Sequence, residues 1–127
     1  MQPVQPFITK ANDNGPEKKI QDDIMDRLKK TDWWVKRLIG NALQFGVPDL
    51  VCARAEYGTK WIEVKYPDRF SFTKAQLIEF PKMIAAGMPI YILFGASDGE
   101  MNRLFKPSNC FEVMHLWSNG LKPQIYR

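Results

Sequence analysis

The chain has 127 residues, of which 45% are hydrophobic and 25% charged, and its formal net charge is +4. This size and balance predict one globular domain with a core of its own. No apolar run approaches the roughly 20 residues needed to cross a bilayer, and the N-terminal sequence lacks the layout of a secretory signal, so a cytoplasmic location is expected. The basic excess favours a polyanionic partner.

Cysteine and histidine are both scarce in this sequence. Cys52 and Cys110 are isolated, and Cys52 falls on the apolar side of a predicted strand, so buried free thiols are expected and a disulfide is not. His115 is the one histidine in the chain, and no role is assigned to it. A single histidine argues against zinc fingers, zinc hydrolases and nucleases that place a histidine base beside a histidine ligand.

The first predicted element is an amphipathic helix. Residues 1–14, with two prolines and few large apolar side chains, predict a flexible arm, and the single domain is expected over 15–127. Asn14 or Gly15 can cap the helix, and Pro16 suits its first position. Its apolar stripe is formed by Ile20, Ile24, Met25 and Leu28.

The next segment, Trp-Trp-Val-Lys-Arg-Leu over 33–38, predicts a first strand. A loop over 40–45 follows it and leads directly to the second strand, so the polar and aromatic groups of this loop are expected to border any site at that strand's start. Lys36 and Arg37 are candidates for phosphate contacts, with a solvated strand end as the simpler interpretation.

A β-hairpin is predicted at the centre of the chain. Two apolar runs, 46–55 and 59–65, flank Glu56-Tyr57-Gly58, which suits a three-residue loop with glycine in the left-handed position. This loop would place Asp49 opposite Lys65, and Val51 opposite Glu63. Because side chains alternate between faces, the two acids and the lysine then share one face. The other face is expected to be core, with Leu50, Cys52, Ile62 and Val64.

Two carboxylates and a lysine on one face of an apolar hairpin are costly to desolvate unless something compensates. A divalent metal would do so, since Mg²⁺ prefers one or two carboxylates completed by waters and phosphate oxygens. Lys65 would then act on a water or on charge that develops at a phosphate. The alternative for an isolated Glu-x-Lys is an ordinary surface ion pair. Glu17, on the buried edge of the first helix, either serves the helix dipole or adds a third carboxylate.

A connection over 66–70, which contains Pro67, separates the hairpin from a second helix. Thr73 with Gln76 forms a capping-box pattern at the start of this helix, which is expected to end at Gly87. Pro81 inside it predicts a kink or an early break. Residues 88–95 form a buried strand, parallel to the Glu63 strand because a helix connects them.

The C-terminal part is predicted in less detail. Residues 96–99 predict a turn and 101–105 an edge strand. Ser108 or Asn109 can cap a short final helix that closes near Gly120, whose aromatic and methionine content indicates core packing or a dimer contact. The sequence contains no internal repeat and no glycine-rich loop of the kind that cradles phosphates, so no nucleotide cofactor is expected.

Gly-Val-Pro-Asp-Leu over 46–50 and Ile-Glu-Val-Lys over 62–65 occur in order on adjacent predicted strands. With this pair of motifs the sequence resembles the PD-(D/E)xK nuclease superfamily over roughly residues 15–95. Within that superfamily it is most similar to the small stand-alone VRR-NUC domains of phages and to archaeal-type Holliday junction resolvases. The resemblance implies an α/β restriction-endonuclease-like core, a central mixed sheet of four to five strands flanked by helices in αβββαβ order.

The resemblance also implies roles for individual residues. Asp49 and Glu63 become metal ligands, with Glu17 as a third carboxylate and the Val64 backbone carbonyl as a further ligand. Lys65 becomes the active-site lysine. In these nucleases a glutamine near the start of the helix that follows the Glu-x-Lys strand points into the site, and Gln76 matches that place. Candidate nucleic-acid contacts are Lys36, Arg37, Arg69 and Lys74.

These expectations together describe a Mg²⁺-dependent endodeoxyribonuclease, with Mn²⁺ able to substitute. The chain is too small for an evident base-reading module, which favours recognition of DNA shape at Holliday junctions, flaps or other branches. A homodimer is expected by analogy with small resolvases, in the host cytoplasm if the protein is phage-encoded. The alternatives are a sequence-specific restriction-type nuclease, and a nucleic-acid-binding or protein-interaction module that keeps the fold without cleaving.

Overall fold

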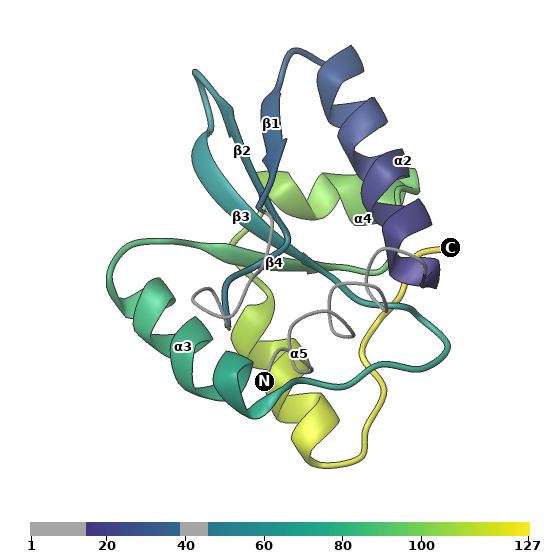
Figure 1. Cartoon of the computed structure of the whole chain (residues 1–127), viewed down its shortest axis with the longest axis vertical. Helices are drawn as coiled ribbons and strands as arrows, with labels where there is room; N and C mark the ends of the chain where they lie inside the picture. The colour runs from purple at the N-terminus through teal and green to yellow at the C-terminus, as the bar shows by residue number, and fades with distance from the viewer. Residues whose placement is uncertain (1–14, 39–45) are drawn as a thin grey trace, which may run out of the picture.

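The computed structural model describes residues 15–38 and 46–127 (Figure 1). The predicted arm over 1–14, the predicted loop over 40–45 and the candidate cap Asn14 lie outside these ranges. In chain order the elements are α2 (Pro16–Lys30), β1 (Trp34–Arg37), β2 (Leu50–Arg54), β3 (Gly58–Val64), α3 (Lys74–Ala85), β4 (Ile90–Leu93), α4 (Asp98–Asn102), the 3₁₀ helix η1 (Arg103–Phe105) and α5 (Cys110–Ser118).

The strands form one four-stranded mixed sheet in the order β1-β2-β3-β4. β1 pairs antiparallel with β2, and β2 pairs antiparallel with β3. β4 pairs parallel with β3 after the crossover through α3, as the strand–helix–strand order requires. The predicted αβββαβ order and mixed sheet are therefore confirmed. Among the described helices, none has the length and apolar character needed to span a bilayer.

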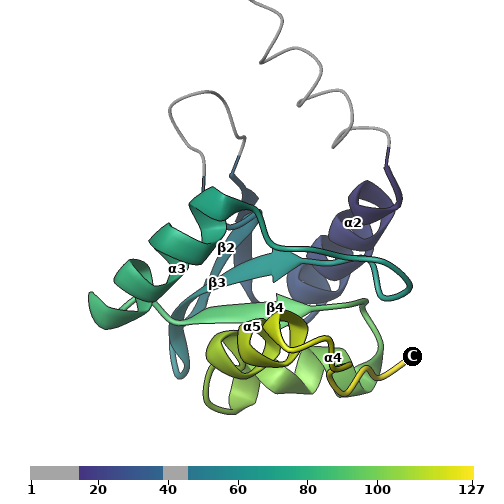
Figure 2. The same cartoon turned by 90° about the horizontal axis from the view of Figure 1, so that it is seen from below.

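The sheet separates two hydrophobic cores, and the helices divide between its faces (Figures 1 and 2). On one face α2, α4 and η1 bury one side of the central hairpin, including the four apolar residues predicted to be core, all fully buried. On the other face α3 and α5 cover β4, with Phe80 and Val113 at the centre. In α2, Ile24 and Leu28 are buried, which confirms its apolar stripe.

The register of the β2–β3 hairpin differs from the predicted one. The Tyr57 N–H donates to the Arg54 carbonyl at 2.9 Å, and Gly58 pairs with Arg54. The loop is therefore 55–57, and Gly58, with φ +75°, is the first residue of β3. Each pairing shifts by two residues, so Val51 lies opposite Trp61 where Glu63 was expected. Because the shift is even, every side chain keeps its predicted face.

One further prediction is wrong in the second half of the chain. Residues 101–105 form no edge strand but are helical, in α4 and η1, and the Ser97 side chain caps α4 by accepting the Glu100 N–H. Of the two outcomes predicted for Pro81, the early break does not occur, since α3 continues through it to Ala85. The predicted features at the ends of α3 are confirmed: Thr73 and Gln76 form a complete capping box, and Gly87, with φ +92°, follows its last turn.

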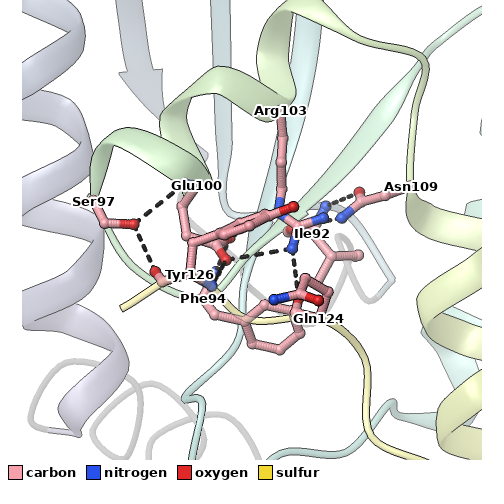
Figure 3. A network of polar contacts seen from close by, with 8 residues as sticks. All are labelled: Ile92, Phe94, Ser97, Glu100, Arg103, Asn109, Gln124 and Tyr126. Carbon is pink, nitrogen blue, oxygen red and sulfur yellow. Dashed lines mark hydrogen bonds and ion pairs between the residues drawn. The ribbon is translucent and has the colours of Figure 1, made fainter.

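Side chains occupy the outer edge of β4. The Asn109 amide accepts the Ile92 N–H at 2.8 Å and donates to the Ile92 carbonyl at 3.0 Å. The fully buried Glu100 accepts the Phe94 N–H at 3.0 Å. Glu100 also accepts the Tyr126 N–H at 2.9 Å and pairs with Arg103, which attaches the C-terminal segment to β4 and α4 (Figure 3).

Candidate active site

The predicted acids and lysine meet where β2 begins and β3 ends. Asp49 immediately precedes β2, Glu63 lies near the end of β3, and Lys65 directly follows it. One step beyond the Leu50–Ile62 pair, the register places Asp49 opposite Glu63. The β2–β3 pair lies between α2 and α3 (Figure 2). The structure thus brings all three side chains to one place on one face.

The backbone fixes Asp49. Its Oδ2 accepts the Val64 N–H at 2.8 Å, and its carbonyl accepts the Leu38 N–H at 2.7 Å. The same register places Pro48 opposite Val64. Proline has no N–H to donate across the hairpin to the Val64 carbonyl. The Val64 N–H therefore bonds to the Asp49 side chain instead of to the backbone of the opposite strand. The Val64 carbonyl, a predicted metal ligand, faces Pro48, which cannot donate a hydrogen bond to it.

Gln76 connects the helix start to both charged residues of β3. Its Nε2 donates to Glu63 Oε2 at 2.9 Å, and its Oε1 accepts from Lys65 Nζ at 2.9 Å. The same Oε1 accepts the Thr73 N–H at 3.1 Å, closing the capping box. The cap and the contact with the site are therefore one arrangement, and α3 holds Gln76 in a single orientation.

Lys65 is almost completely buried, with 4% of its surface exposed. Its Nζ lies 3.1 Å from Glu63 Oε2, and 4.6 Å from the centre of the Phe72 ring. A buried ammonium needs such partners to offset its desolvation. Two of its three N–H groups are directed to Glu63 and Gln76, so its position is set by the acid and the amide together.

The two acids are poorly compensated by the protein alone. Burial, and then the charge of Glu63, raise the pKa of Asp49 well above its usual value. Burial also raises the pKa of Glu63, against the opposing effect of Lys65. Within the described residues, the buried Glu63 Oε1 finds no hydrogen-bond partner. A buried acceptor without a donor costs about 1–3 kcal/mol, which a cation at this oxygen would remove.

Glu17 lies close enough to interact with the same group of charges. Burial raises the pKa of its carboxyl, while the Lys65 ammonium and the Tyr66 N–H act in the opposite direction. Its charge in turn raises the pKa of Asp49 and of Glu63. The structure thus places Glu17, in the first turn of α2, within electrostatic range of Asp49, Glu63 and Lys65.

A metal would have to be held by more than carboxylates. Within 15–38 and 46–127, no three His, Cys, Asp or Glu side chains converge as a complete metal cluster. Mg²⁺ does not require one, because it commonly keeps several waters and binds through one or two carboxylates. Asp49, the unpartnered Glu63 Oε1 and the Val64 carbonyl fit such a site, since all three are hard oxygen donors.

The predicted nucleic-acid contacts are distributed unevenly. Lys36 on β1, Arg69 in the connection and Lys74 at the start of α3 are exposed. Arg37 is engaged instead by α2: its Nη2 lies 2.5 Å from an Asp22 oxygen and its Nε donates to Gln21 at 2.9 Å. Its guanidinium therefore ties β1 to α2.

Three neighbours of the site received no role from the sequence. Phe72 lies beneath the Lys65 ammonium, and Pro48 opposes Val64. Gly46 has φ +83°, and a Cβ there would lie 2.9 Å from the Ala75 carbonyl oxygen and from Glu79 Cγ. The Gly-Val-Pro-Asp motif could have indicated the glycine and the proline, since both are residues chosen for backbone reasons. No sequence signal indicated Phe72.

The sheet topology, the helices on both faces and the position of the acids define a restriction-endonuclease-like α/β fold. Within this class the fold is that of a VRR-NUC domain. A solved structure described as a VRR_NUC domain superposes with a TM-score of 0.55 at 20% sequence identity, covering 63% of this chain and 85% of that one. No family model and no curated protein sequence matches the chain. The fold expected from the two motifs is confirmed.

Proposed function

We propose that this protein is a metal-dependent endonuclease that hydrolyses phosphodiester bonds in DNA. The observation that carries the proposal is the meeting of half-buried Asp49 with buried Glu63 and Lys65, in which the Glu63 Oε1 has no hydrogen-bond partner within the described residues. Replacing a buried ion pair by well-packed apolar side chains is often neutral or stabilising, so stability alone does not account for these groups. The nuclease name of the similar solved structure supports the same function.

Each side chain has a distinct task in this proposal. Asp49 and Glu63, together with the Val64 carbonyl, would hold a divalent cation, Mg²⁺ or Mn²⁺. When bound, that cation supplies Lewis acidity for the attacking water and the departing oxygen. The third N–H of Lys65 is available to a phosphate oxygen. Gln76 keeps Lys65 and Glu63 in place through its two hydrogen bonds.

The substrate follows from the surroundings of the site. The exposed cations nearest to it in sequence, Arg69 and Lys74, suit phosphate contacts, which position DNA without reading its bases. Within residues 15–38 and 46–127 there is no recognition helix or zinc finger suited to major-groove readout, so we propose recognition of branched or otherwise distorted DNA. A homodimer would match the two-fold symmetry of a junction.

The test is cleavage of labelled four-way junction, flap, linear duplex and single-stranded DNA in Mg²⁺, in Mn²⁺ and in EDTA. We expect metal-dependent nicking that is lost in Lys65→Ala. Lys29→Ala, which removes an exposed lysine at the far end of α2, is the matched control and should cleave normally. Binding without cleavage under every metal condition would instead support the non-cleaving module.

A further inference from the structure

The face of the sheet that carries the acids continues beyond them as an open surface. In an antiparallel sheet, residues directly opposite each other share a face. The register therefore defines two rows next to Asp49 and Glu63 on that face. The nearer row is Lys36, Val51 and Trp61, and the farther row is Trp34, Ala53 and Thr59.

The helices of the described part of the chain cover only part of this face. α3 and α5 pack on β4, where Ile90 is buried, and Trp61 packs against their core. Toward β1 the cover ends: Trp34 is 55% exposed, and Lys36 and Thr59 are exposed as well. In Figure 1 the ends of β1 and β2 near the β2–β3 turn stand clear of α3 and α5.

The chemistry of the two rows favours a nucleic-acid strand. They contain two tryptophans, one lysine and no carboxylate. Exposed aromatic side chains on a sheet stack unpaired bases, and an adjacent cation neutralises the phosphates between them. The row of Trp34 lies four residues along β2 from Asp49, about 14 Å at the rise of an antiparallel strand.

We propose that an unpaired strand leading into the site lies along these rows, with one base stacked on Trp34 and a phosphate on Lys36. This rests on the proposed nuclease function and narrows its substrate. A distance of about 14 Å corresponds to about four steps of a stacked strand. The preferred DNA would therefore carry several unpaired nucleotides beside the cleaved bond, as a flap does and as the fully paired arms of a four-way junction do not.

Binding of labelled oligo-dT in EDTA tests this without cleavage, by anisotropy and by quenching of tryptophan fluorescence. We expect Trp34→Ala to weaken binding about 5-fold or more, as loss of one stacked base does, and Trp34→Phe to retain most of the affinity. Lys36→Ala should lower the slope of log K against log salt by about 0.7. The matched controls are Phe111→Ala, at 54% exposure on α5, and Lys30→Ala at the end of α2.

Three results would overturn the proposal. The first is wild-type affinity in Trp34→Ala. The second is equal loss in Trp34→Phe and Trp34→Ala, which would mean that an aromatic ring is not what matters. The third is a Trp34→Ala variant that sediments as a monomer where the native protein sediments as a dimer, with the same affinity for oligo-dT. That result would assign the surface to a second copy of the chain. Cleavage lost in Lys65→Ala would leave the nuclease function standing in each case.

Discussion

A bound Mg²⁺ should stabilise the native protein through Asp49, and Asp49→Asn should abolish that effect without unfolding the chain. An asparagine is nearly the same size, and its Oδ1 can still accept the Val64 N–H that Asp49 accepts at 2.8 Å. It also removes a charge that now lies beside Glu63. The variant therefore tests the metal site with little disturbance of the fold.

The size of the effect follows from mass action. At a Mg²⁺ concentration 100 times Kd, binding to the native state alone adds about 2.7 kcal/mol. For 127 residues, an unfolding entropy of about 2.1 cal/mol/K per residue gives about 0.27 kcal/mol/K. Saturating Mg²⁺ should thus raise the Tm of the native protein by about 10 °C.

The pH dependence of the metal-free protein has a defined sign. Because burial raises the native pKa of both Asp49 and Glu63, the native state binds more protons than the unfolded state above the ordinary carboxyl pKa of about 4. The contribution of these two acids to stability without metal should therefore be greatest below that pH and fall as pH rises through their raised native pKa values. Asp49→Asn should make this fall smaller.

Thermal melts followed by circular dichroism, in EDTA and in saturating Mg²⁺, measure both effects. Asp26→Asn, an exposed acid on α2, is the control and should keep the full Mg²⁺ response. An equal Mg²⁺ shift in Asp49→Asn and the native protein would refute the ligand assignment. So would a native protein whose Tm does not respond to Mg²⁺ or Mn²⁺ at any concentration.

Three other variants or measurements test separate parts of the structure. Gln76→Ala should lose cleavage and about 1–2 kcal/mol of stability, because it removes the hydrogen bond to Glu63. Thr73→Ala removes only the helix cap, so it should lose about 1 kcal/mol and keep cleavage. Thermal melts and activity assays on both variants measure the difference. Burial raises the pKa of both cysteine thiols to about 12, so they should stay protonated and unreactive toward a disulfide reagent at pH 8 until the protein unfolds; rapid labelling of the native state would contradict this. Gly99→Ala should lower the Tm despite alanine's better helix propensity, because its Cβ would lie 2.5 Å from Tyr126 Cγ, whereas Gly95→Ala meets nothing within 4 Å and should melt close to the native protein.

The sequence was sufficient to predict which side chains share the site but not which of them face each other. The period of two along a strand assigns Asp49, Glu63 and Lys65 to one face, and an even error in register leaves that assignment intact. The opposing residue depends on the loop. Gly58, in the left-handed conformation, belongs to β3 and not to the loop. Its pairing with Arg54 decides this, and the residue types of the loop do not predict that pairing.

The second half of the chain carries a local signal for a helix at residues 97–100. Ser97-Asp98-Gly99-Glu100 has the spacing of a capping box, and Ser97 does cap α4. The apolar residues that follow suggested a strand because short apolar runs fit either element. The contacts that decide the matter, from Glu100 to Phe94 and to Tyr126, join segments far apart in the sequence. Local pattern alone could not supply them.

The side chains along β4 also affect how this protein behaves at high concentration. A bare edge strand is a template on which another chain can add, and sheet proteins that leave it open risk growing into fibres. A second chain that added to β4 would first have to break the hydrogen bonds of the Asn109 amide to the Ile92 N–H and carbonyl. It would also have to break the hydrogen bond of the Phe94 N–H to Glu100. An Asn109→Ala variant should therefore aggregate at high concentration, measured as turbidity, under conditions where its circular dichroism spectrum is still that of the native fold.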